Sequence, residues 1–166
     1  MRRVVRIPSV VCLAIFALPL VAAAANLPDF SGSYALKSVK GEDKPDPGQA
    51  VSLQIAQTND EIKITTITDG HPSTEIFPLG NSEGRCGGTI ATDSKCSALW
   101  NGKILVLESV YTAHPTENGP DVEMHTRERL QLSSDGMLLT IRTDTKAPEY
   151  PALEMSPPSA EVYARY

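Results

Sequence analysis

Apolar and polar residues alternate along most of the chain, and this alternation constrains the fold more than any other feature. Val51, Leu53 and Ile55, for example, are each followed by a polar or small residue. A period of two residues is that of a β-strand, whereas the period of 3.6 residues typical of an amphipathic helix is nearly absent. The sequence therefore predicts an all-β protein. Further strands are predicted at 62–65, 75–79, 88–91, 96–100, 103–113, 122–132 and 137–143.

The connections between these segments are short and have the chemistry of tight turns. Asn59–Asp60, Asp69–Gly70, Asn101–Gly102 and 134–136 separate neighbouring strands, and Asn-Gly and Asp-Gly accept the positive φ that hairpins need. Short turns favour an antiparallel up-and-down meander. About eight such strands with one apolar face would close into a barrel, which removes the edge strands. A β-sandwich is the alternative, although few connections are long enough to cross between two sheets.

The turns also predict which residues lie opposite each other. A two-residue turn at Asn101–Gly102 places Ala98 opposite Leu105 and Trp100 opposite Lys103, with Trp100 on the inward face. Each predicted pairing collects apolar side chains on one face, as a buried sheet surface requires. The turns at 59–60 and 135–136 predict the pairs Ile55–Ile64, Leu53–Thr66, Leu132–Leu139 and Leu130–Ile141.

Residues 1–25 have the features of a cleaved export signal. Three arginines precede an apolar run at 10–22, and Ala23 and Ala25 are the small residues that a signal peptidase recognises. The run is too short to span a bilayer comfortably, so no stable membrane anchor is expected. The mature protein is therefore predicted to be extracytoplasmic, either periplasmic or secreted. It would be a single domain at 26–166 that ends in a proline-rich segment at 147–166.

The charge of the mature chain excludes one class of partner. The signal carries three of the 15 basic residues and none of the 20 acidic ones, so 12 basic and 20 acidic residues remain, a net charge of −8. Nucleic acids and anionic membranes attract basic surfaces, and no lysine or arginine cluster provides one here. We expect no binding to nucleic acid.

Two cysteines, Cys86 and Cys96, remain after the signal, which contains the third. In an oxidising compartment such a pair is expected to form a disulfide. A metal or redox pair is the competing interpretation. Their spacing is not that of a Cys-x-x-Cys motif, and no histidine lies between them.

Three segments carry motifs of one protein family. Residues 29–36 look like a Phe-x-Gly-x-Trp-x-Leu opening with Tyr34 at the tryptophan position, and 98–105 resemble a Trp-Asp-Gly-x-x-Leu hairpin. Residues 129–140 are similar to a Trp-x-Leu-Ser-x-Asp-Gly-x-x-Leu-Thr segment. In this order the motifs resemble those of secreted, lipocalin-like bacterial β-barrel proteins. The resemblance implies a roughly eight-stranded lipocalin-like barrel with an internal cavity for an apolar ligand.

Glu128 is a polar residue that strict alternation places on the inward, apolar face. Such a carboxylate must find a partner or raise its pKa. The predicted register puts Thr143 opposite Glu128 on one neighbouring strand, while Ser109 and Tyr111 face inward on the other. One interpretation makes these residues, with the inward Trp100, a ligand-binding site. In the other, Glu128 is solvated at a barrel end or a bulge, or is paired with an adjacent arginine.

No catalytic or metal-binding motif stands out. His71, His114 and His125 are the only histidines, and nothing in their spacing makes them converge on a metal ion. No serine lies in a Gly-x-Ser-x-Gly nucleophile elbow. We therefore assign no catalytic residue, no metal ligand and no cofactor from the sequence.

Three functions are compatible with these features. The leading hypothesis is an exported, non-enzymatic barrel that binds a small apolar or amphipathic ligand. The second is an envelope or extracellular protein-interaction module with a fully packed barrel. The third is a cofactor-free enzyme that uses Glu128 inside the barrel. The sequence predicts neither the identity of a ligand nor the oligomeric state.

Overall fold

The computed structural model describes residues 27–40, 50–80, 84–88, 94–113, 121–150 and 158–166, and these residues are all-β. The predicted signal at 1–25, His114 and residues 151–157 of the proline-rich segment lie outside the described residues. Within them, no helix has the length and apolar character needed to cross a membrane. The strands are β1 (Gly32–Lys40), β2 (Val51–Gln57), β3 (Glu61–Thr68), β4 (His71–Pro78), β5 (Gly84–Arg85), β6 (Gly87–Gly88), β7 (Lys95–Asn101), β8 (Ile104–Ala113), β9 (Val122–Leu132), β10 (Leu138–Lys146) and β11 (Ser159–Arg165).

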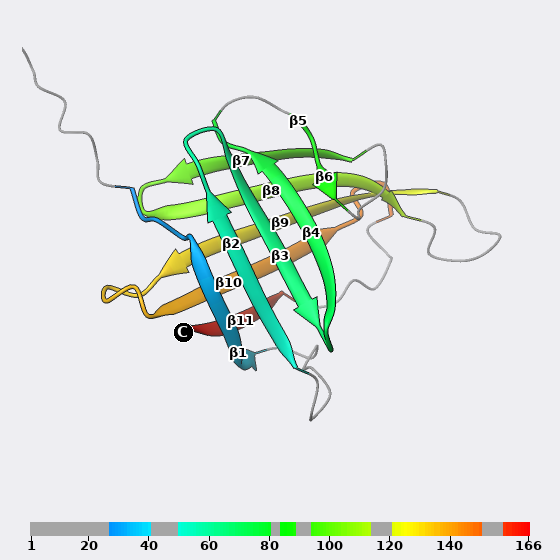
Figure 1. Ribbon diagram of the computed structural model, residues 1–166. Coiled ribbons are helices and arrows are strands. Elements are labelled where there is room, and N and C mark those ends of the chain that lie inside the picture. Colours follow the sequence, from blue (N-terminus) through cyan, green and yellow to red (C-terminus); the bar gives the residue numbers. More distant parts are fainter. Residues whose placement is uncertain (1–26, 41–49, 81–83, 89–93, 114–120, 151–157) are drawn as a thin grey trace, which may run out of the picture.

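The strands form one antiparallel sheet that curls into a nearly closed barrel (Figure 1). The long strands follow the order β7-β8-β9-β10-β11-β1-β2-β3-β4, so that β11 brings the C-terminal segment beside β1. A parallel bridge between Leu79 and Ala98 and a hydrogen bond from the amide of Gly80 to the carbonyl of Ala98 (3.0 Å) join the β4 and β7 sides. The predicted up-and-down barrel is therefore confirmed, with nine long strands among the residues described.

Most of the predicted strand pairings are confirmed. Ile55 lies opposite Ile64, and Leu132 lies opposite Leu139, as their turns indicate. The predicted register at Asn101–Gly102 is wrong, because Asn101 pairs with Ile104 and Gly102–Lys103 form the turn. Asn101 stays in extended backbone and only the glycine has a positive φ, of 62°. Glycine in the first turn position suits a type II′ hairpin.

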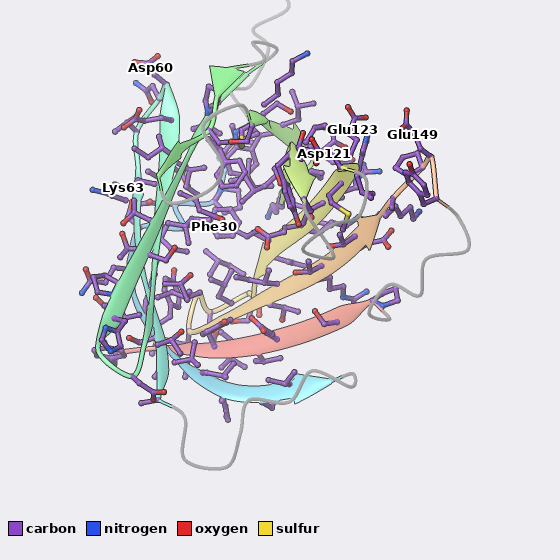
Figure 2. The ribbon with its side chains drawn as sticks, turned by 90° about the vertical axis from the view of Figure 1, so that its right-hand side faces the viewer. Phe30, Asp60, Lys63, Asp121, Glu123 and Glu149 are labelled. Carbon is purple, nitrogen blue, oxygen red and sulfur yellow. A yellow bond between two sulfur atoms is a disulfide. The ribbon has the colours of Figure 1, made fainter. Side chains whose placement is uncertain are left out.

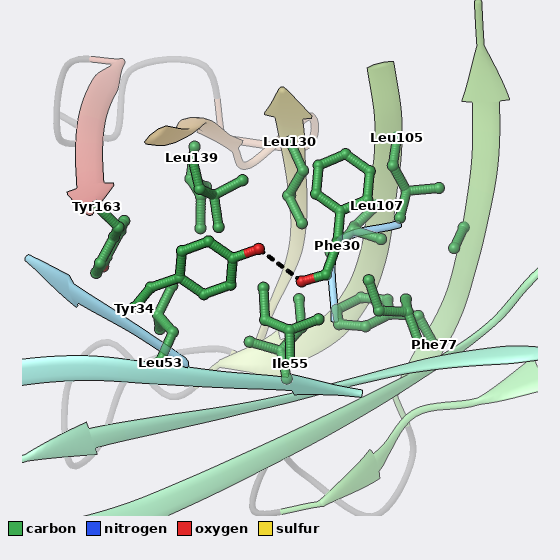
Figure 3. Close-up of a cluster of buried hydrophobic side chains, with 14 of the residues drawn as sticks. Phe30, Tyr34, Leu53, Ile55, Phe77, Leu105, Leu107, Leu130, Leu139 and Tyr163 are labelled. Atoms are coloured by element: carbon green, nitrogen blue, oxygen red, sulfur yellow. Dashed lines mark hydrogen bonds between the residues drawn. The ribbon is translucent and has the colours of Figure 1, made fainter. Parts of the chain in front are cut away.

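The predicted inward face nevertheless forms the core. Ala98, Leu105, Leu107 and Leu130 are all buried, and Trp100 is partly buried and packs against them. Figure 3 shows side chains from many strands meeting in the barrel interior. The fully buried large side chains are Phe30, Tyr34, Ile62, Leu105, Leu107, Leu130, Leu139 and Val122.

One end of the barrel is closed by residues from the first and last strands. The hydroxyl of Tyr34 donates a hydrogen bond to the carbonyl oxygen of Phe30 (2.8 Å), as Figure 3 shows. It also accepts one from Nη2 of Arg165 (2.8 Å). The same nitrogen donates to the carbonyl oxygen of Ser31 (2.5 Å), and the guanidinium lies 5.2 Å from the centre of the Tyr34 ring. A Cβ atom on Gly32 would come within 2.9 Å of Nε of Arg165. The Phe-x-Gly-x-aromatic motif therefore provides the space and the ring for this arginine.

The predicted disulfide is present. Cys86, between β5 and β6, is bonded to Cys96 of β7, and their Cα atoms are 5.0 Å apart. The bond ties the short β5–β6 segment to the barrel wall. In the chain-entropy account, closing so short a loop stabilises the fold by about 3 kcal/mol.

The disulfide predicts the number of free thiols in the mature protein. This form lacks residues 1–25 and therefore also lacks Cys12. Titration under denaturing, non-reducing conditions should find none, whereas two should appear after reduction, because Cys86 and Cys96 are then the only cysteines. Two free thiols before reduction would contradict the disulfide.

Candidate functional site

A cavity of about 270 Å³ lies inside the barrel, between β4 on one side and β8 and β9 on the other. Its size is near the lower end of the range for small-molecule sites. Phe77 and Leu107 are buried apolar residues and form the apolar part of the lining. The complete lining among the described residues is Glu75, Phe77, Leu107, Ser109, Tyr111, Thr126 and Glu128.

Glu128 occupies the position that the alternation predicts. It lies in β9, opposite Thr143 of β10 and opposite Leu107 of β8. Burial, and after it the negative charges of Glu75 and Glu161, raise the pKa of the Glu128 carboxyl group to about 7, although a hydrogen bond with Thr143 partly opposes the shift. The group is therefore able to exist in both protonation states near neutral pH.

Two further carboxylates face the interior, and the sequence analysis did not identify them. Glu75 lies two residues before the buried Phe77 on β4, opposite the buried Ile64 of β3. Burial raises the pKa of Glu75. Glu161 lies on β11 two residues before the buried Tyr163, whose hydroxyl donates a hydrogen bond to Oε2 of Glu161 (2.5 Å). In both cases the carboxylate lies two residues before a buried aromatic side chain, and strict alternation would have placed it on the same inward face.

The structure brings together four of the five residues predicted for a ligand site. Ser109, Tyr111 and Glu128 line the cavity, and Thr143 lies directly across from Glu128. Trp100 faces inward but lies elsewhere, because its ring stacks on Phe30 with the centroids 5.9 Å apart, and it is not part of the lining.

The open end of the barrel also carries acidic residues. Figure 2 shows Asp121 and Glu123, at the start of β9, near Glu149, which follows β10, and well away from Phe30. All three are exposed. Tyr111 pairs with Met124, so this rim is at the end of the barrel where the cavity-lining residues of β8 lie. Among the described residues, acidic side chains therefore lie at this end of the barrel as well as in its interior.

The histidines do not form a metal site in the part of the chain described. His125 lies on the outer surface and its Nε2 is 2.7 Å from Oε1 of Glu123, whereas His71 is exposed at the start of β4. No group of three or more His, Cys, Asp or Glu side chains among the described residues could hold a metal ion.

A second hollow, of about 300 Å³, lies on the outer surface of β8, β9 and β10. Four of its charged groups form two pairs: Nε of Arg127 is 3.4 Å from Glu108, and Nζ of Lys146 is 3.2 Å from Asp144. Exposed pairs of this kind contribute about 0.5 kcal/mol or less to stability. The internal cavity is the stronger candidate for a ligand site, because no basic side chain among the described residues lines it beside its carboxylates.

The chain thus forms a nearly closed antiparallel β-barrel with a cavity among its inward-facing side chains. No family model matches the sequence, and no curated protein sequence matches it either. Solved structures with a similar fold include the REP1-NXSQ fatty acid transporter, with a TM-score of 0.54 and 12% identity over 82% of this chain and 96% of that one. A variant of the fluorescent protein UnaG has a TM-score of 0.52 and 13% identity, with 82% of this chain and 96% of that one covered. At such identities the likeness establishes the fold alone.

Proposed function

We propose that this protein is an exported, non-enzymatic, lipocalin-like barrel that binds a small apolar or amphipathic molecule in its internal cavity. The observation that carries the proposal is the cavity itself, where the apolar Phe77 and Leu107 meet the polar Ser109, Tyr111 and Glu128. The lining therefore offers a ligand both apolar surface and several converging polar groups, a combination that suits an amphipathic molecule. Similarity to a barrel described as a fatty acid transporter supports a ligand with an apolar part.

Export is supported by the chemistry of the chain. The basic start, short apolar run and small residues at 23 and 25 are those of a signal peptide. The Cys86–Cys96 disulfide suits an oxidising compartment outside the cytoplasm. We propose a periplasmic or secreted protein for these reasons.

A cofactor-free enzyme is the second candidate. A carboxyl group with a pKa of about 7 inside a cavity is able both to donate and to accept a proton at neutral pH. This candidate requires that the bound molecule be converted, whereas a binding protein releases it unchanged. Native mass spectrometry of protein purified from its own host distinguishes them through the mass of a retained molecule before and after incubation.

The binding proposal is tested with a neutral apolar fluorophore, N-phenylnaphthylamine. We expect one-to-one binding by the wild type, and a loss of affinity of about tenfold or more in Ser109→Phe, because the larger side chain fills the space next to Glu128. Thr112→Phe is the matched control, since Thr112 is an exposed residue of the same strand. Fluorescence titration measures affinity, and circular dichroism verifies folding. No binding by the wild type, or equal binding by Ser109→Phe, would overturn the proposal.

A further inference from the structure

The interior of the barrel has an excess of negative charge. Glu128 and Glu75 line the cavity from opposite walls, and Glu161 faces inward from β11. The charges of Glu75 and Glu161 both act on Glu128 and both disfavour its ionisation. None of the described lining residues is basic. Arg165, an arginine that does reach the interior, is held by Tyr34 and Ser31 at the closed end of the barrel.

This distribution of charge disfavours an anionic ligand. The carboxylate of a fatty acid would add a further negative charge to a site of low polarity, where repulsion between like charges is weakly screened. A protonated amine, in contrast, would donate hydrogen bonds to the Glu128 carboxylate and offset the charges of Glu75 and Glu161. The hydroxyl groups of Ser109 and Tyr111, on β8, line the same cavity and provide further acceptors.

We propose that the cavity binds an amphipathic amine, with the ammonium group at Glu128 and the apolar part against Phe77 and Leu107. This inference rests on the proposed function and specifies its ligand class. An organic cation fits better than a metal ion, because the described acidic side chains do not form a metal-binding group. The exposed Asp121, Glu123 and Glu149 would attract a cation to the open end of the barrel.

Binding of an ammonium group should depend on pH in a specific way. The titratable groups that face Glu128 are Glu75 from β4, Tyr111 from β8, and Glu161 and Tyr163 from β11. Burial and the neighbouring Glu161 raise the pKa of Tyr163, so at neutral pH its hydroxyl remains a neutral donor. Glu128 is therefore a group that changes charge near pH 7, and an alkylammonium ion should bind more tightly as the pH rises through that value.

The test uses three ligands of one chain length: octylammonium, octanol and octanoate. Isothermal titration calorimetry at pH 8 should give the order octylammonium, then octanol, then octanoate. In Glu128→Gln, the affinity for octylammonium should fall by about tenfold or more, since a charge-assisted hydrogen bond is lost, while octanoate should bind no more weakly than before. Glu61→Gln is the matched control, because it removes the same charge from an exposed position on β3.

The outcomes separate the two proposals. If octanoate binds to the wild type as tightly as octylammonium, or if Glu128→Gln leaves the affinity for octylammonium unchanged, the amine inference is wrong while ligand binding stands. If none of the three ligands and no apolar fluorophore binds, the proposed function is wrong and the inference falls with it. A rise in octylammonium affinity between pH 6 and pH 8 that is absent in Glu128→Gln would support the assignment to this carboxylate.

Discussion

At pH 8, replacing Glu128 with glutamine is expected to raise the free energy of unfolding by about 2 kcal/mol. The ordinary pKa of a glutamate is 4.5, and burial with two nearby negative charges raises that of Glu128 to about 7. Each unit of pKa corresponds to about 1.4 kcal/mol. We expect a smaller gain in stability than the full pKa shift would give, because water has partial access to this side chain. Glutamine keeps the shape and the acceptor oxygen for Thr143 but carries no charge.

The gain should depend on pH, and its sign follows from proton linkage. The folded protein binds the Glu128 proton more tightly than the unfolded chain, since the pKa is higher in the folded state. The stability of the wild type should therefore fall as the pH rises from about 4.5 through about 7, as the proton is lost. The variant lacks this group, so the difference between the two proteins should be small at pH 4.5 and largest above pH 7.

Urea denaturation at pH 5 and pH 8, with the disulfide intact, measures this difference. Glu61→Gln should change the free energy of unfolding by less than about 0.5 kcal/mol at both values, because Glu61 is exposed. A Glu128→Gln variant that differs from the wild type equally at pH 5 and pH 8 would show that the Glu128 carboxyl group is not desolvated.

The barrel could be predicted because its determinants are local. Alternation assigns side chains to faces, and a turn of known length then fixes the register, as for Ile55 with Ile64. The prediction failed at Asn101–Gly102 because the same two residues permit two registers. In a type I′ turn both would need a positive φ, whereas the structure keeps Asn101 in the strand and uses the freedom of Gly102 alone.

The candidate site was only partly predictable, because alternation gives the face of a residue but not its depth in the barrel. Glu128 and Thr143 follow from one hairpin, so their pairing could be predicted. Trp100 shares the inward face but stacks on Phe30, away from the cavity. Its position along the barrel axis depends on how neighbouring strands are staggered, which alternation does not specify. Glu161 was missed because it lies in the proline-rich segment, where no neighbouring turn sets a register.

Contacts between the chain ends were beyond sequence reasoning. Arg165 meets Tyr34 and Ser31 only because β11 pairs with β1, and no local pattern indicates that pairing. The motif around Gly32 is visible in the sequence. The reason for a glycine there is seen only in the structure, where the Arg165 guanidinium packs against it and leaves no space for a Cβ atom. A residue whose partners are distant in sequence therefore requires the three-dimensional structure.

The Tyr34→Ala variant is expected to lower the free energy of unfolding by about 4 kcal/mol, the largest effect among these predictions. Tyr34 is fully buried, and removing a buried aromatic ring forfeits its burial and leaves a cavity. The substitution also removes the ring against which the Arg165 guanidinium packs, and the hydroxyl to which Nη2 donates a hydrogen bond. A domain of ordinary stability would lose a large part of its free energy of unfolding.

Tyr34→Phe separates the hydroxyl from the ring. It keeps the packing but leaves the carbonyl oxygen of Phe30 without its donor and Arg165 without one acceptor, so a loss of about 1–2 kcal/mol is expected. Tyr166→Ala is the control, because Tyr166 is 77% exposed, and its effect should be within about 0.5 kcal/mol. Urea denaturation measures all three variants. Equal losses for Tyr34→Phe and Tyr34→Ala would contradict the role of the ring.

The same variants test whether closure and binding are separate. The contacts of Tyr34 are to Phe30 and Arg165 at the closed end, whereas the cavity is lined by residues such as Ser109 and Glu128 nearer the other end. Tyr34→Phe should therefore keep the affinity for octylammonium while it loses stability, and Glu128→Gln should lose that affinity while it gains stability at pH 8. A loss of octylammonium binding in folded Tyr34→Phe would show that the two ends of the barrel are coupled.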